Sequence, residues 1–207
     1  MTTRSAASRT SRERAKAQRA DSLLQAAARL FAEHGFDGVS LEDLGTAVGI
    51  TGPAVYRHFD SKRALLGAIL LRASDDLLTG GRRVIDAGHG PDRSLRELVD
   101  FHVQFAVRGA DVIRVHDRDL ARLSEEDRYE VRRLQREYVE LWVGVLHAVH
   151  PDLTESELRV RAHAGFGLIN STPYAVRTRR DAAVDAGDDG MLRDVLADMA
   201  YAALAAR

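Results

Sequence analysis

Apolar residues recur along this chain at spacings of three and four, and the alternation with a period of two that marks half-buried β-strands is missing. A spacing of three and four follows one face of an α-helix, which turns once in about 3.6 residues. The pattern therefore predicts an all-α protein of about nine helices. One such face, on a helix expected over residues 14–34, comprises Leu23, Leu24, Ala27, Leu30 and Phe31.

Helix start and stop signals divide this pattern into segments. Ser40, Ser124 and Thr154 each stand three residues before an acidic residue, which is typical of the first turn of a helix. Glycines after residues 34 and 48, and the Gly- and Pro-containing run at 87–93, interrupt the pattern. The expected helices span about residues 14–34, 41–48, 52–59, 61–86, 94–108, 111–120, 124–149, 154–176 and 191–205, with Pro173 bending or shortening the eighth.

The helices group into three parts of the chain. Residues 1–13 are rich in Ser, Thr and Arg and predict a disordered basic arm, residues 14–62 a three-helix head, and residues 63–207 a larger helical body. The absence of cysteine excludes a disulfide framework and a thiolate zinc site. No apolar run approaches the roughly 18 residues of a membrane span, and the polar first 19 residues lack the apolar core of a signal peptide. We therefore expect a cytoplasmic protein with no membrane partner.

Charge is unevenly distributed, although the net charge of the whole chain is only −1. Residues 1–19 carry +5, residues 1–63 carry +3, and residues 64–207 carry −4. A basic end on an otherwise acidic chain predicts that this end meets a polyanion such as DNA.

The second and third expected helices are short, and a four-residue turn that contains Gly49 joins them, as in a helix-turn-helix. In that motif the second helix enters the major groove of DNA while the first braces it across the backbone. Val55 and Phe59, four residues apart, are expected to face the head core instead, and Arg57 has an alternative partner in Asp60. The residues expected to contact DNA are Ser40, Thr51, Gly52, Ala54, Tyr56, Arg57, His58 and Lys62.

The same segment carries five short motifs: FAEHGF at 31–36, VSL at 39–41, AVGI at 47–50, VYRHF at 55–59 and SK at 61–62. On these motifs the chain resembles the N-terminal domain of the tetracycline-repressor (TetR) family of bacterial one-component regulators, strongly over about residues 15–70. The resemblance implies a homodimer that represses transcription by binding a palindromic DNA operator. It also implies release of that operator when a small apolar or amphipathic effector enters the body.

The head departs from the family pattern at two positions. Arg63 stands where the family often has Glu, and Gly52 stands where a basic residue is common. Because Gly52 has no side chain, fewer base contacts are available, and we expect sequence discrimination to depend on Thr51, Tyr56, Arg57 and the arm.

The body sequence predicts an effector pocket, because its helices combine aromatic residues with a few polar groups. The alternative is an ordinary apolar core whose polar side-chain tips reach solvent. The candidate pocket residues are Phe101, His102, Phe105, Arg108, Trp142, Leu146, His147, Phe166, Asn170 and Tyr174.

The last helix carries an apolar stripe that predicts a dimer interface, formed together with the preceding helix as a four-helix arrangement between two copies. The alternative is burial of the same stripe within one chain. The candidate interface residues are Gly165, Leu168, Ile169, Leu192, Val195, Leu196, Met199 and Ala203.

Other function classes find little support in the sequence. His147 and His150 are three residues apart, but no HExxH motif accompanies them, so we expect no metal site. A nucleophile elbow, a P-loop and a dinucleotide-binding fingerprint are also missing, and we expect neither catalytic residues nor a cofactor. An all-helical enzyme, a metal sensor and an effector-free architectural DNA binder remain the alternatives.

Overall fold

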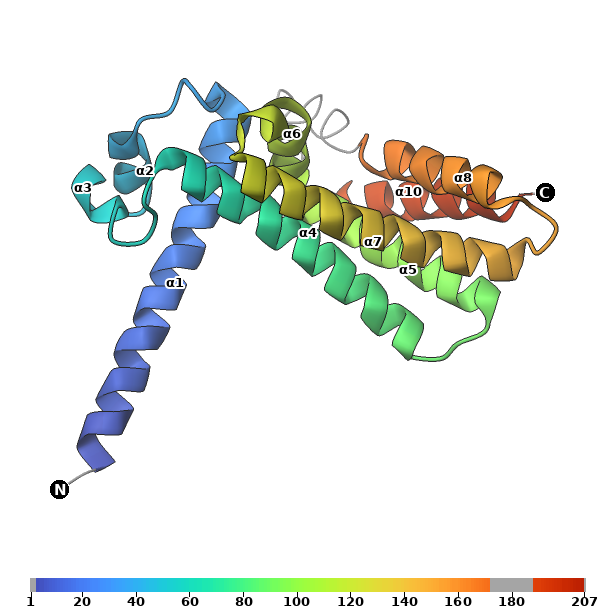
Figure 1. Ribbon diagram of the computed structural model, residues 1–207, viewed down its shortest axis with the longest axis horizontal. Coiled ribbons are helices and arrows are strands. Elements are labelled where there is room, and N and C mark those ends of the chain that lie inside the picture. Colours follow the sequence, from blue (N-terminus) through green and yellow to red (C-terminus); the bar gives the residue numbers. More distant parts are fainter. Residues whose placement is uncertain (1–2, 172–187, 207) are drawn as a thin grey trace.

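The computed structural model describes residues 3–171 and 188–206, with side chains for residues 16–171 and 190–206. Within these ranges the chain is helical and contains no strand, so the predicted all-α class is confirmed (Figure 1). The elements are α1 Thr3–His34, α2 Leu41–Ala47, α3 Gly52–Val55, α4 Lys62–Asp86, α5 Pro91–Arg108, α6 Ala110–Asp119, the 3-10 turn η1 Leu120–Arg122, α7 Glu125–Val149, α8 Glu155–Ile169 and α10 Asp188–Ala205.

Three predicted boundaries differ from the structure by four residues or more. The expected disordered arm is helical from Thr3, and α1 projects beyond the other helices in Figure 1. Residues 3–20 contain neither Gly nor Pro, and Ala and Arg are strong helix formers, so a lack of apolar residues did not mean a lack of helix. The helix α3 ends at Val55 rather than at residue 59, and α8 ends at Ile169 rather than at residue 176.

Side-chain caps fix the starts of several helices as predicted. Ser40 and Asp43 form a capping box at α2, in which Asp43 N donates to Ser40 Oγ at 3.1 Å and Ser40 N donates to Asp43 Oδ2 at 2.8 Å. Thr154 and Glu157 form the same reciprocal pair at α8. Each box satisfies backbone N–H groups that the first helical turn leaves unpaired.

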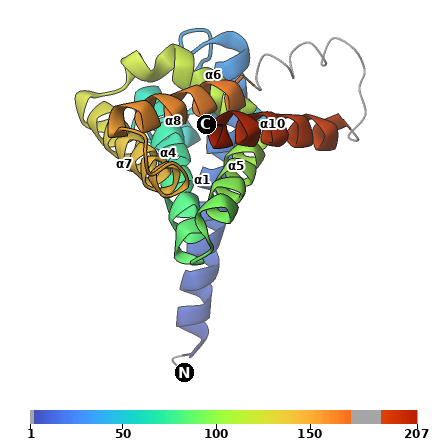
Figure 2. The same cartoon turned by 90° about the vertical axis from the view of Figure 1, so that its right-hand side faces the viewer.

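The body packs around Trp142, whose side chain is fully buried. In Figure 2, α7 lies beside α4 and α10 lies beside α5, with α8 between the two pairs. Two glycines of α4 allow this packing: a Cβ at Gly80 would lie 2.0 Å from the Phe101 ring, and one at Gly81 would lie 2.7 Å from the Tyr138 ring. The rings of α5 and α7 therefore rest directly on the backbone of α4.

The helices that the structure describes include none with both the length and the apolar composition needed to span a bilayer. The head, formed by α1, α2, α3 and the start of α4, has its own apolar core around Phe31, Leu44 and Val55. Because α4 belongs to both cores, the head and the body share one continuous helix.

Candidate nucleic-acid interface and ligand cavity

The turn between α2 and α3 is tightly closed by glycines. Gly49 has a φ of +70°, a conformation that favours glycine, and a Cβ at Gly45 would lie 2.7 Å from the Ile50 carbonyl oxygen. Gly52 is buried, and a Cβ there would lie 3.1 Å from Glu42 Oε1. This corrects the assignment of Gly52 as a DNA contact, because its position faces α2 rather than solvent.

Thr51, which precedes α3, and Tyr56 and Arg57, which follow it, have exposed side chains, while Ala54 within α3 is half-buried. The Tyr56 side chain is 53% exposed. Val55 is fully buried, as predicted, so α3 packs on the head core while the polar residues that flank it face outward. Ser40 is exposed at the start of α2, but its hydroxyl is already engaged in the capping box.

His58 lies half-buried at the end of this face, and its Nδ1 is buried without a hydrogen-bond partner among the described residues. Burial lowers the pKa of its imidazole, and the nearby charges of Lys16, Arg19 and Arg57 lower it further. Lys16 and Arg19 belong to α1, so the fold brings a basic stretch of the first helix to α3. No individual contact of these two residues could be predicted from the sequence, although the net positive charge of residues 1–19 includes both of them.

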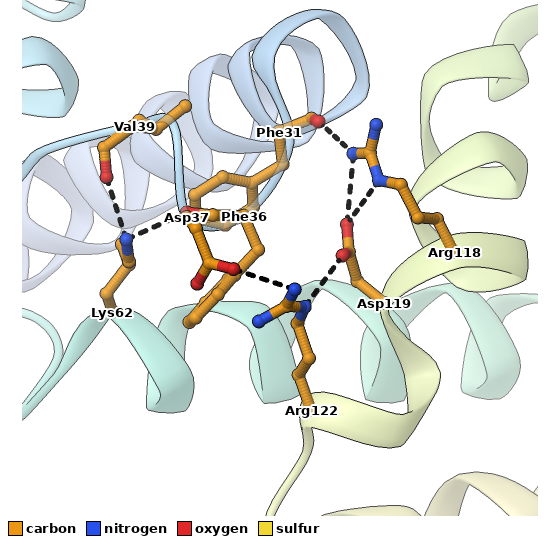
Figure 3. Close-up of polar contacts among 8 residues, drawn as sticks. All are labelled: Phe31, Phe36, Asp37, Val39, Lys62, Arg118, Asp119 and Arg122. Atoms are coloured by element: carbon orange, nitrogen blue, oxygen red, sulfur yellow. Dashed lines mark hydrogen bonds and ion pairs between the residues drawn. The ribbon is translucent and has the colours of Figure 1, made fainter.

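Lys62 is not a free phosphate-binding side chain, which corrects that prediction. Its Nζ donates to the carbonyl oxygens of Phe36 at 2.7 Å and Val39 at 2.9 Å, and it lies 4.5 Å from the centroid of the Phe36 ring (Figure 3). The ammonium group therefore points into the loop between α1 and α2, and its role is to hold that loop against the start of α4.

Three of the candidate effector residues form a packed aromatic centre together with Tyr138. The Phe166 ring stacks on His102 at 5.1 Å and meets Trp142 edge-on at 5.2 Å, measured between ring centroids. Burial lowers the pKa of His102 to about 4, so its imidazole is neutral at physiological pH. The neutral ring lies within hydrogen-bond distance of the Tyr138 hydroxyl and of Asn170 Oδ1, each at 3.2 Å.

Two hollows lie next to this centre, and Phe105 lines both. A groove of about 370 Å³ runs between α1, α4, α5 and α6, and Phe101 and Arg108 also line it. A smaller cavity of about 90 Å³ lies between α4, α5, α6 and α7, and Asn170 closes one side of it. Four candidate residues thus border open space, whereas His102, Trp142 and Phe166 form the packed wall behind it.

The remaining candidate pocket residues fall elsewhere. Leu146 is fully buried in the body core, and His147 is exposed and lines neither hollow, because adjacent positions on a helix face different directions. Tyr174 lies outside the described residues. The sequence could not distinguish these positions, because a broad apolar stripe does not reveal which of its residues pack in the core and which line a hollow.

The candidate dimer residues divide in the same way. Val195, Met199 and Ala203 of α10 are exposed and Leu168 is half-buried. By contrast, Gly165, Ile169, Leu192 and Leu196 are buried within the single chain, which corrects their assignment to an interface. Gly165 packs under Leu204 of α10, where a Cβ would lie 3.1 Å from the leucine methyl groups. Val160 of α8 and Met191 of α10 are large exposed apolar residues that the sequence analysis missed.

The described residues contain no group of three or more His, Asp or Glu side chains that could hold a metal ion. The fold and the site together define an all-α chain that carries a helix-turn-helix head on a helical body. Two family models match it: one of bacterial regulatory proteins, tetR family, over residues 23–69, and one of the tetracyclin repressor-like C-terminal domain over residues 88–174. The chain belongs to the TetR family.

Curated relatives of the chain are transcriptional regulators. The transcriptional repressor KstR2 of Rhodococcus jostii is 31% identical over 134 residues, which cover 64% of this chain and 66% of the repressor. The regulator UidR of Escherichia coli is 32% identical over 87 residues, covering 42% of this chain and 44% of UidR. The chain therefore spans slightly less than two thirds of the length of KstR2 and less than half of the length of UidR.

Solved structures extend the likeness over most of the chain. A TetR-family transcriptional regulator from Bordetella parapertussis matches with a TM-score of 0.75 and 25% identity, covering 89% of this chain and 93% of that one. AibR, solved in complex with isovaleryl coenzyme A and operator DNA, matches with a TM-score of 0.69 and 21% identity over 87% and 97% of the two chains.

Proposed function

We propose that this protein is a transcriptional repressor that binds operator DNA through α3 and leaves it when a small amphipathic molecule enters the body. The exposed face of Thr51, Tyr56 and Arg57 carries this proposal, because it places polar side chains outward from a closed helix-turn-helix. Lys16 and Arg19 beside His58 add positive charge where a phosphate backbone would pass. A regulator of this kind acts where the bacterial chromosome lies, in the cytoplasm.

A homodimer supplies the second head that a palindromic operator needs. The exposed apolar residues Val160 on α8 and Met191, Val195 and Met199 on α10 support an interface that these two helices form. Met199→Arg is expected to yield a folded monomer in sedimentation experiments, because the residue is 53% exposed in the single chain. Leu196→Arg places a charge in the body core and is expected to unfold the chain instead.

The groove beside Phe105 favours an effector with an apolar body and an anionic end. Phe101, Phe105 and Ile69 supply apolar walls, while the exposed Arg108 supplies a cation at the rim. Isovaleryl coenzyme A, the compound bound in AibR, is therefore a suitable first probe. Because Trp142 is the only tryptophan, its fluorescence reports on binding, and an effector is expected to change it over the concentration range that releases DNA.

The DNA proposal is tested with a duplex selected from a random library by the purified protein. Fluorescence anisotropy then measures affinity for wild type, Tyr56→Ala and Arg57→Ala, with Arg159→Ala on the body as a matched control. If Arg57 contacts a phosphate, its loss reduces the slope of log affinity against log salt by about one. Selection of no duplex, or equal affinities for all four proteins, would contradict the proposal.

A further inference from the structure

A buried carboxylate joins the body to the head. Asp119, at the end of α6, has a side chain that is 2% exposed, and its two oxygens pair with Arg118 at 3.0 Å and Arg122 at 3.2 Å. Both arginines also contact the head (Figure 3). Arg118 donates to the Phe31 carbonyl oxygen, and Arg122 Nη2 lies 2.7 Å from Asp37 Oδ2. We refer to Arg118, Asp119 and Arg122 as the Asp119 clamp.

The clamp holds the loop of residues 35–40 that leads into α2. The Phe36 ring of this loop lies between two cations, with Arg122 at 5.6 Å and Lys62 at 4.5 Å from its centroid. Figure 3 shows that Lys62 comes from the start of α4 and the arginines from the other side, so two separate elements contact this loop. Ser40, which caps α2, is the last residue of this loop, and the position of the loop therefore sets the position of α2.

The other side of α6 borders the cavity beside Phe105. Val112, Ile113 and His116 line the 90 Å³ cavity, and Val112 also lines the larger groove. His116 Nε2 lies 2.7 Å from Gln135 Nε2 of α7, so this part of α6 is tied to the body. A helix of ten residues thus touches the cavity along its length and ends in the clamp.

We propose that the Asp119 clamp transmits occupancy of the cavity beside Phe105 to α2 by moving the loop of residues 35–40. This inference rests on the proposed function, since it concerns how the effector site controls the DNA-binding head. A molecule that displaces α6 carries Asp119 and its two arginines with it, which shifts or releases the contact of Arg118 with Phe31 of α1 and the contact of Arg122 with Asp37 of the loop. The continuous helix α4 and the direct packing of α6 on α1, where Val115 belongs to the head core, offer other routes, and the experiment must separate the clamp from both.

The chemistry of the clamp suits a link that can be released. Arg118 and Arg122 are 42% and 45% exposed, so water can replace their bonds to the head at little cost. Asp119 is buried and must keep at least one arginine, because an unpaired buried carboxylate is strongly unfavourable. The bonds to Phe31 and Asp37 can therefore exchange while the Asp119 centre stays intact.

Hydrogen exchange measured by mass spectrometry tests the link without DNA or effector. Arg122→Ala removes the contacts to Asp37 and Phe36 but leaves Arg118 to pair with Asp119. We expect exchange of residues 36–47 to rise by about fivefold, with no change in the body helices. Arg159→Ala is the matched control, because Arg159 also pairs with two carboxylates but joins α7 and α8 within the body.

A filled cavity is mimicked by Ala73→Phe, since Ala73 lines both hollows. In the wild-type background this substitution is expected to change the exchange of residues 36–47, and in the Arg122→Ala background it is expected to add nothing. An equal change in both backgrounds would assign the route to α4 or to the packing of α6 on α1, and either result would overturn the proposal. No change in the wild-type background, for Ala73→Phe and for the smaller Ala73→Leu alike, would overturn it as well.

These outcomes are independent of the proposed function. If the protein selects no DNA duplex but shows the expected exchange pattern, the clamp proposal is supported and the repressor proposal is contradicted. The opposite result is that the protein binds DNA with an affinity that depends on Arg57, while neither Arg122→Ala nor Asp119→Asn changes hydrogen exchange. This result would support the repressor proposal and contradict the clamp proposal.

Discussion

The loop of residues 35–40 and the aromatic centre of the body are held by opposite kinds of contact. Around the loop, half-exposed cations bind carbonyl oxygens, carboxylates and one aromatic ring. In the centre, His102, Tyr138, Trp142 and Phe166 pack ring against ring on a glycine-lined part of α4.

The difference indicates where the molecule can move. Half-exposed ion pairs contribute about 0–1 kcal/mol each, because water competes for both partners. Close-packed buried rings lose contacts outright when they separate, and the penalty reaches several kcal/mol. We therefore expect a rigid body centre and an adjustable connection at the loop, and substitutions in the two regions should differ in their effect on global stability.

The largest effect is expected for Trp142→Ala in the aromatic centre. The side chain is fully buried, and its removal leaves a cavity that the neighbouring rings cannot fill. Chemical denaturation is expected to show a loss of about 3–5 kcal/mol in the free energy of unfolding. Tyr129→Ala, at a position that is 65% exposed, serves as the control and should stay within about 0.5 kcal/mol of wild type. A loss below about 1 kcal/mol for Trp142→Ala would show that the centre is loosely packed.

The second effect is a pH dependence that originates at His102. Burial lowers the pKa of this histidine from 6.5 to about 4 in the folded chain, so between these values the unfolded state binds the extra proton. The contribution to stability is therefore complete above about pH 6.5 and is lost as the pH falls toward 4, by about 3 kcal/mol in total.

Unfolding free energies measured from pH 7.5 to pH 4.5 check this expectation. His102→Gln is expected to be less stable at neutral pH but to lose much less stability on acidification than wild type does. His147→Gln, an exposed histidine on the same bundle, controls for removal of a histidine from the surface. Parallel pH curves for wild type and His102→Gln would assign the acid sensitivity to carboxylates instead.

Much of the architecture could be predicted from local signals. The capping boxes at Ser40 and Thr154 fixed two helix starts, and glycines fixed the ends at His34 and the turn after Val48. The outward face of α3 followed from the burial of Val55 and from its spacing. These features depend on residues within a few positions of each other, so a single sequence contains the information.

The errors concern residues whose roles depend on distant parts of the chain. Lys62 was assigned to DNA because its bonds to Phe36 and Val39 span more than twenty positions and leave no local trace. Leu196 was assigned to a dimer interface because an apolar stripe on a helix does not reveal which half meets its own core. The Asp119 clamp was missed for the same reason, since Phe31 and Asp37 are about 80 or more residues away from the arginines they meet.

Lys62→Met sharpens the comparison at the loop itself. Methionine keeps an apolar stem beside Phe36 but removes both charged hydrogen bonds, and we expect a loss of about 1–2 kcal/mol in the free energy of unfolding. Operator affinity should also fall, because α2 loses one of its two anchors. The slope of log affinity against log salt should stay at the wild-type value, whereas a reduction by about one would restore Lys62 as a phosphate contact.

The smallest effect on stability is expected for Asp37→Asn, at the outer end of the clamp. Asp37 is 70% exposed and Arg122 keeps Asp119 as a partner, so the free energy of unfolding should change by less than about 0.5 kcal/mol. A double-mutant cycle of Asp37→Asn with Arg122→Ala isolates the pair, and chemical denaturation of the four proteins measures its coupling. The adjustable connection requires this coupling to be small and to shrink further in high salt, because both groups face water. A salt-insensitive coupling above about 1.5 kcal/mol would mean that the loop is fixed as firmly as the aromatic centre, and the contrast between the two regions would fail.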